Sequence, residues 1–192
     1  MTFQDARQIL AALLEEHGET ENLAVTVSSR ALTPEEAIGN PDRKDFPLLH
    51  GKEVLMQAEI DGFAGQAFTG DPLVFEGLVK DVLELDPDRP GHQALLIATL
   101  NALARKMGKT DRTIHCVNNE PEECAALVCS FLREKYGPCR VGIIGYQPAL
   151  LEACSKEFGP DHVFITDLNP DNIGQTRYGV EVWDGATDTD RL

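Results

Sequence analysis

The stretch RVGIIGYQPALLEACSKEF, from Arg140 to Phe158, decides the fold of the C-terminal part of the chain. It opens with apolar, β-prone residues, continues through two glycines, Gly142 and Gly145, and then repeats apolar residues at helical spacing after Pro148. This order predicts a buried strand, a tight corner and a helix. The same corner could bind a phosphate or nucleotide, or it could be a simple turn.

The sequence that follows repeats the alternation. A β-prone run at 162–167 precedes a polar loop at 168–178 and a second short run at 180–183. Strands that alternate with a helix form parallel sheets, so residues 138–192 are expected to form a partial α/β Rossmann-like domain. Gly137 and Pro138 mark its expected boundary.

The preceding residues, 1–137, have a different organisation. A capped amphipathic helix ending near Gly18 precedes β-prone runs at 23–32, 53–60 and 63–69, and Asp61-Gly62 joins the last two with hairpin chemistry. Helical spacing then covers 73–83, 91–107 and 120–136. Strands followed by helices predict an α+β domain with a meander of three antiparallel strands.

Composition limits the possible partners. The chain has 192 residues, 42% of them hydrophobic, and a formal net charge of −15, which repels nucleic acid and anionic lipid surfaces. No stretch approaches the roughly 20 apolar residues that span a bilayer, so a cytoplasmic location is expected. The five cysteines lack the spacing of a zinc site and are expected to be free thiols.

Candidate binding residues lie where the predicted parallel strands end, because ligands of open parallel sheets bind beyond those ends. Asp167 lies about 20 residues after Gly145, the offset at which an acid holds ribose hydroxyls in dinucleotide-binding folds. The glycine fingerprint of those folds is incomplete, and Pro148 removes one amide donor. The run DLNPDNIG at 167–174 is either an oxygen-rich binding edge or an Asx-rich turn. The candidate ligand-binding residues are Asn101, Gly145, Tyr146, Gln147, Asp167, Asn169, Asp171 and Asn172.

Four segments carry a family resemblance: GFAGQAFT (62–69), ATLNALARKMG (98–108), VGIIGYQPALLEAC (141–154) and DLNPDNIG. The chain resembles, over nearly its whole length, the heavy-metal chelation family, in which an enolase N-terminal-like α+β domain precedes a Rossmann-like domain. The resemblance implies a site between the two domains, built from the helix of Asn101, the Gly145 corner and the 167–172 loop. Family members continue through further strands, so the resemblance also implies that the second domain is partial here.

Three functions follow as hypotheses. The first is a small-ligand binding protein that holds a metal chelate or an anionic metabolite between the domains, with a metal ion as the candidate cofactor. The second is an enzyme that uses a nucleotide-type cofactor at the strand ends, with Asp167 on ribose hydroxyls. The third is a noncatalytic subunit that forms homo-oligomers through an open sheet edge. The sequence does not decide whether any reaction is catalysed.

Overall fold

The computed structural model describes residues 3–16, 26–51 and 53–192. The chain forms two compact units, each containing both helices and a β-sheet. The first unit comprises Met1–Asn40 and Leu48–His115, and the second comprises Pro41–Pro47 and Cys116–Leu192. The expectation of a mixed α and β protein is confirmed at this level.

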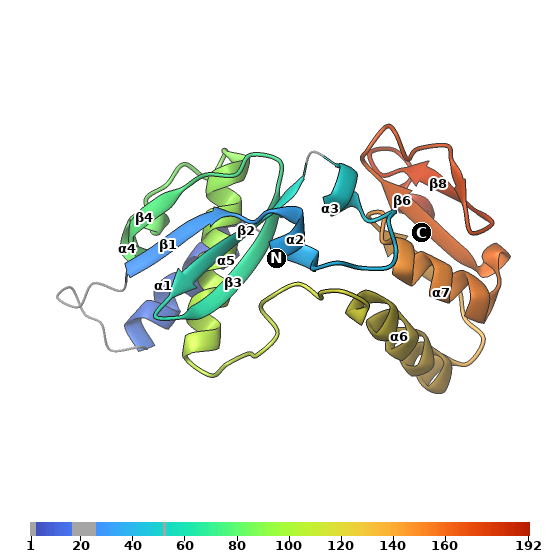
Figure 1. Ribbon diagram of the computed structural model, residues 1–192, viewed down its shortest axis with the longest axis horizontal. Helices are drawn as coiled ribbons and strands as arrows, with labels where there is room; N and C mark the ends of the chain where they lie inside the picture. The colour runs from blue at the N-terminus through green and yellow to red at the C-terminus, as the bar shows by residue number, and fades with distance from the viewer. Residues whose placement is uncertain (1–2, 17–25, 52) are drawn as a thin grey trace. The chain divides into compact units, whose positions relative to one another are not determined.

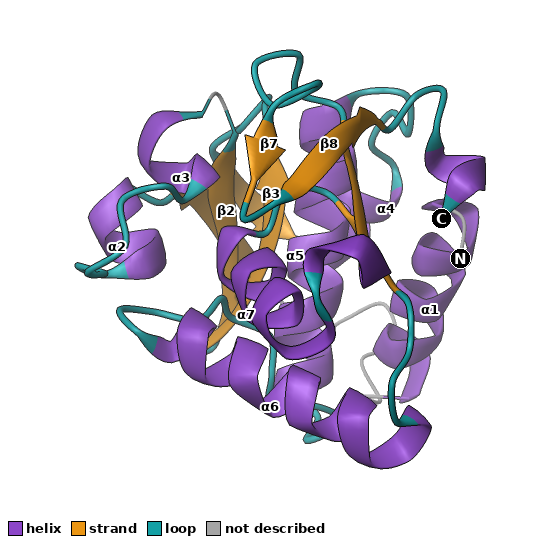
Figure 2. Ribbon diagram, turned by 90° about the vertical axis from the view of Figure 1, so that its right-hand side faces the viewer, coloured by secondary structure: helices purple, strands orange, loops and turns teal. Residues whose placement is uncertain are grey.

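The division differs from the one expected at Gly137 and Pro138. Helix α6 (Glu120–Tyr136) was expected in the N-terminal domain, but it packs against α7 (Pro148–Phe158) and belongs to the second unit. Figure 2 shows the two helices side by side. The helical pattern of α6 located the helix but carried no information about which sheet it would cover.

The first unit has a four-stranded antiparallel sheet in the order β3-β2-β1-β4. Its helices and strands are α1 (Phe3–Glu16), β1 (Thr26–Ala31), α2 (Pro34–Ile38), α3 (Pro47–His50), β2 (Val54–Ile60), β3 (Phe63–Thr69), β4 (Phe75–Leu78), α4 (Val79–Leu83) and α5 (Pro90–Lys106). Asp61 and Gly62 both have positive φ and close the β2–β3 hairpin, as expected.

Two features of this unit differ from the expectation. Residues 75–78 form a strand rather than the start of a helix, because they pair with β1 in a register that sets Gly77 beside Val27. The polar segment after β1 contains a short helix, α2, for which no helix was predicted. Thr33 and Glu36 form a reciprocal capping box that starts α2. Residues 17–25, where the first strand was expected to begin, lie outside the described residues.

Helix α5 supplies most of the core of the first unit. It runs across one face of the sheet, with α1 beside it (Figure 1). Leu95, Leu96 and Leu103 of α5 are fully buried against Met56 and Ile60 of β2. The helix lies so close to β3 that only glycine fits at position 65.

The second unit has a four-stranded sheet in the order β5-β6-β8-β7. Its strands are β5 (Val141–Ile144), β6 (Val163–Asp167), β7 (Thr176–Arg177) and β8 (Val180–Asp184), and short 3-10 turns lie at Pro160–His162 and Thr189–Arg191. Strands β5, β6 and β8 are parallel, which confirms the expected alternation of strand and helix, whereas β7 pairs antiparallel with β8. Ile143, Leu151 and Ile165 form the centre of the core between the sheet and α7.

Candidate functional site

The corner after β5 is a left-handed turn held by backbone hydrogen bonds. Gly145 has φ of 84°, and its amide donates to the carbonyl oxygen of Thr166 at 2.8 Å. The next amide, that of Tyr146, donates to Oδ2 of Asp167 at 2.6 Å. The turn therefore joins the carboxyl ends of β5 and β6, where the sequence analysis placed its candidate binding residues.

Asp167 organises the loop that follows β6. Its Oδ1 accepts hydrogen bonds from the amide of Asn169 at 2.7 Å and from Nδ2 of Asn172 at 3.3 Å. Asn169 in turn accepts the amide of Asp171 at 3.0 Å through Oδ1. The run from Asp167 to Asn172 is thus an Asx-rich turn whose first residue is tied to the β5 corner.

This network bears on how the glycine corner could bind a phosphate. A phosphate cradle needs free amide donors, but the amide of Tyr146 is bonded to a carboxylate and Pro148 has no N–H. The carboxylate of Asp167 would also repel a phosphate at that position. The corner is therefore a turn that positions the Asp167 side chain, and the amide of Tyr146 is not free to bind an anion.

Asp184 is a strand-end acid that the sequence analysis missed. In the register of the parallel strands it lies directly beside Asp167, and its Oδ1 accepts the amide of Ala186 at 2.8 Å. The amide of Gly185 donates to the backbone oxygen of Asp167 at 2.8 Å. The rule that selected Asp167 also applies to Asp184, because each ends a parallel strand.

A groove of about 380 Å³ lies along β5 and reaches the corner at Gln147. Val128 and Leu132 of α6 and Leu150 of α7 line it together with the strand. Gly142, which lines the groove, leaves room for a small side chain, since an added Cβ would lie 3.4 Å from its nearest neighbour, the Cβ of Leu192. Gln147 is exposed and is the predicted site residue that faces this groove.

Asn101 belongs to the first unit, whereas the other seven predicted residues belong to the second. Its Nδ2 donates to the backbone oxygen of Gln66 at 3.0 Å, which gives the carboxamide a partner on a largely buried helix. Gln66 also accepts the amide of His115 at 2.6 Å through Oε1. Asn101 therefore joins α5 to β3, and its expected part in a ligand site stays a prediction.

The second unit also contains a charged cluster that sequence reasoning did not identify. Arg43, whose side chain is only 11% exposed, forms ion pairs with Asp45 at 3.0 Å and with Glu152 of α7. Tyr178 has positive φ, and its hydroxyl donates to Oδ2 of Asp45 at 2.7 Å and accepts from Nη2 of Arg43 at 3.0 Å. Burial, reinforced by Asp45, raises the pKa of Tyr178 to about 12. Residues 41–47, which we call the strap, are held in the second unit by these contacts.

The cluster also affects Tyr146 at the corner. Burial raises the pKa of Tyr146, and the negative charges of Asp45 and Asp167 raise it further. The phenol is therefore neutral at physiological pH and can donate or accept a hydrogen bond. The strap and the strand-end loop thus act on one tyrosine, although they lie far apart in the sequence.

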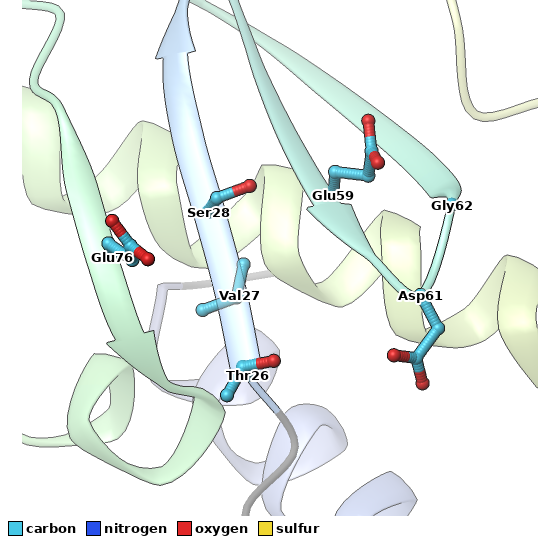
Figure 3. A pocket seen from close by; sticks show the side chains of 7 residues that line it. All are labelled: Thr26, Val27, Ser28, Glu59, Asp61, Gly62 and Glu76. Atoms are coloured by element: carbon cyan, nitrogen blue, oxygen red, sulfur yellow. The ribbon is translucent and has the colours of Figure 1, made fainter.

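The first unit has an acidic hollow of about 260 Å³ on its sheet (Figure 3). Ser28 of β1 pairs with Glu59 on one neighbouring strand and with Glu76 on the other. Figure 3 shows the two glutamates on either side of β1, with Asp61 directed away from them. No local pattern could predict this hollow, because its carboxylates come together through strand pairing.

The cysteines are free thiols. Cys129 and Cys154 lie in the core between α6 and α7 with their sulfurs 3.5 Å apart, and burial raises the pKa of Cys154 to about 12. Within residues 3–16, 26–51 and 53–192, no group of three or more His, Cys, Asp or Glu side chains is arranged to hold a metal ion.

Comparisons with known protein families, with curated proteins and with solved structures found no match for the chain. Among the helices in the described part of the chain, none combines the length and the apolar character needed to cross a membrane.

Proposed function

We propose that the second unit is a small-ligand binding module that holds a metal chelate or a similar cationic, donor-rich solute at the carboxyl ends of β5, β6 and β8. One observation carries the proposal: Asp167 and Asp184 end neighbouring parallel strands in register. Two carboxylates at one sheet edge create a negative potential that attracts positive charge. The resemblance to the heavy-metal chelation family points to the same class of ligand.

The hydrogen bonds of Asp167 indicate what kind of ligand fits. Its Oδ2 accepts one N–H, so that oxygen retains an acceptor position. The exposed side chains of Asn169, Asp171 and Gln147 add oxygen acceptors around it. The water or amine ligands of a metal chelate can donate hydrogen bonds to such oxygens. An anionic metabolite would instead be repelled by the carboxylates. The metal chelate is therefore the better supported of the two expected ligand classes.

Calorimetric titration with hexaamminecobalt(III), a cationic complex whose ligands are all N–H donors, tests this proposal. We expect saturable binding that weakens at least about tenfold in Asp184→Asn, since each direct charged contact contributes about 1.5–3 kcal/mol. Glu59→Gln, which removes a carboxylate from the hollow of the first unit, is the matched control and should bind as the wild type does. Equal weakening in both variants would reveal only diffuse attraction to an acidic protein and would contradict the proposal.

A nucleotide-type cofactor is the second candidate, because the open acceptor position of Asp167 also suits a ribose hydroxyl. Adenosine and AMP separate the two candidates. Binding of both adenosine and AMP, lost in Asp167→Asn, with no binding of the cobalt complex, would favour the cofactor. Since the corner offers a phosphate little, we expect neither compound to bind.

A further inference from the structure

Helix α6 exposes an apolar stripe. Leu127 is 71% exposed and Phe131 is 55% exposed, although each lies in the middle of a 17-residue helix. The opposite side of the helix, at Ala125 and Cys129, is buried in the second unit. Val128, beside the stripe, lines the groove along β5, so the apolar surface continues from the helix into the groove.

The charges on this side of α6 are arranged antisymmetrically. Glu123, Leu127, Phe131 and Lys135 follow one another at steps of four residues, so they form one row along the helix. The row begins with an acid, has two large apolar residues at its centre and ends with a base. A second copy of the row that runs in the opposite direction therefore places its base opposite the acid of the first copy. In the described part of the chain, neither Glu123 nor Lys135 forms an ion pair.

We propose that this face of α6 binds a second copy of the chain, with the two α6 helices antiparallel. In that arrangement Leu127 of each copy packs against Phe131 of the other, and Glu123 of each copy lies opposite Lys135 of the other. Rows of residues at four-residue steps are the ridges that most often interdigitate when helices pack. Charge complementarity selects a second copy as the occupant, because the row is complementary to itself and a twofold axis satisfies both charged pairs at once.

The length of the helix limits the strength of the dimer. Seventeen residues span about 25 Å, so the contact falls at or below the lower limit of specific interfaces, about 1,200 Å². We therefore expect a dimer that dissociates on dilution, with a dissociation constant in the micromolar range.

Sedimentation equilibrium of charge-reversal variants tests the pairing directly. Glu123→Lys places two lysines opposite each other, and Lys135→Glu places two glutamates opposite each other, so each variant alone should dimerise at least about tenfold more weakly than the wild type. An equimolar mixture restores both Glu–Lys pairs in the heterodimer, so we expect its dimerisation to return to within about threefold of the wild type. If the substitutions weakened dimerisation only by disturbing the helix dipole, mixing the two variants would not restore it.

Two further results bear on the proposal. Leu127→Ser and Phe131→Ser should each give a monomer with an unchanged circular dichroism spectrum, because both side chains are exposed in the single chain. A monomeric wild type at about 200 µM, or two charge variants that dimerise as the wild type does, would overturn it. It would also be overturned by a dimer that survives these substitutions and is lost in Ile144→Lys, since that result places the interface on the edge of β5.

Discussion

Asp167 accepts hydrogen bonds from three groups that lie on both sides of a strand end: the amides of Tyr146 and Asn169 and the carboxamide of Asn172. The generalisation that ligands bind beyond the carboxyl ends of parallel strands selected this residue from the sequence alone. Its bond to Tyr146 was not predictable, because it joins positions 21 residues apart and depends on the register of β5 and β6. The same rule would have identified Asp184 had the last strand been extended by one residue.

Replacing Asp167 tests its structural part. Asp167→Asn keeps the size of the side chain but removes its charge and one acceptor oxygen, so it should destabilise the protein by about 1–2 kcal/mol. Asp171→Asn is the matched control, because no hydrogen bond to its carboxylate occurs among the described residues, and it should change stability by less than about 0.5 kcal/mol. Urea unfolding measures both, and equal losses would contradict the network.

Tyr178 gives a prediction about alkaline pH. Burial and the hydrogen bond to Asp45 raise its pKa from 10.0 to about 12, so folding favours the neutral phenol. Its contribution to stability is complete below pH 10 and is lost as the pH rises through about 12. Tyr178→Phe should therefore lose less stability than the wild type between pH 8 and pH 11 in urea unfolding under reducing conditions. Burial also raises the pKa of the Cys154 thiol, and it does so in both proteins. Only the difference between their pH profiles therefore reports on Tyr178. Parallel pH profiles of the two proteins would contradict a raised pKa of Tyr178 in the folded state.

At the scale of helices and strands, local signals predicted most of the structure. Hairpin chemistry at Asp61-Gly62 and the alternation after Gly137 gave the antiparallel and parallel pairs correctly. Strand β4 was not predicted, because its apolar residues also fit helical spacing and only pairing with β1 resolves that ambiguity. Helix α2 depends on the capping box of Thr33 and Glu36, which the polar composition of the surrounding segment concealed.

The contact between α5 and β3 depends on one glycine. A Cβ at position 65 would lie 2.2 Å from the backbone nitrogen of Ala102 and 2.3 Å from the oxygen of Ala98, so Gly65→Ala must displace the helix. Overpacking typically costs about 1–3 kcal/mol, and so close an approach to backbone atoms puts this variant at the upper end of that range. Gly142→Ala, in the other sheet, meets its nearest neighbour at 3.4 Å and should be nearly neutral. Thermal unfolding of the two variants compares them, and a neutral Gly65→Ala would show that the two elements pack less closely.

At the scale of the whole molecule, the sequence indicated two units but misplaced the point of division. The strap is a short segment of the second unit that is flanked on both sides by residues of the first. No local pattern marks such an insertion, since it depends on Arg43 meeting Glu152, which lies more than a hundred residues later. Long-range ion pairs of this kind require the folded structure.

Removing Arg43 should loosen the second unit selectively. Arg43→Met leaves Asp45 without its cation, whereas Glu152 keeps its ion pair with Lys156. Because both carboxylates are also partly exposed, we expect a loss of about 2 kcal/mol rather than the larger cost of a fully buried pair. Hydrogen–deuterium exchange should rise in α7 and β8 and remain unchanged in β2 and β3. Arg30→Met, which breaks a largely exposed pair with Glu36, is the control and should alter neither. Faster exchange in β2 and β3 alone would contradict the assignment of the strap.

The central claim is that a donor-rich cation binds at the ends of β5, β6 and β8. Amide chemical shifts of ¹⁵N-labelled protein during titration with hexaamminecobalt(III) at physiological salt test it most directly. We predict saturable shifts at Gly145, Tyr146, Asn169 and Gly185, and none on titration with inorganic phosphate. Shifts confined to the acidic hollow around Ser28, or a larger response to phosphate at the corner, would contradict the account.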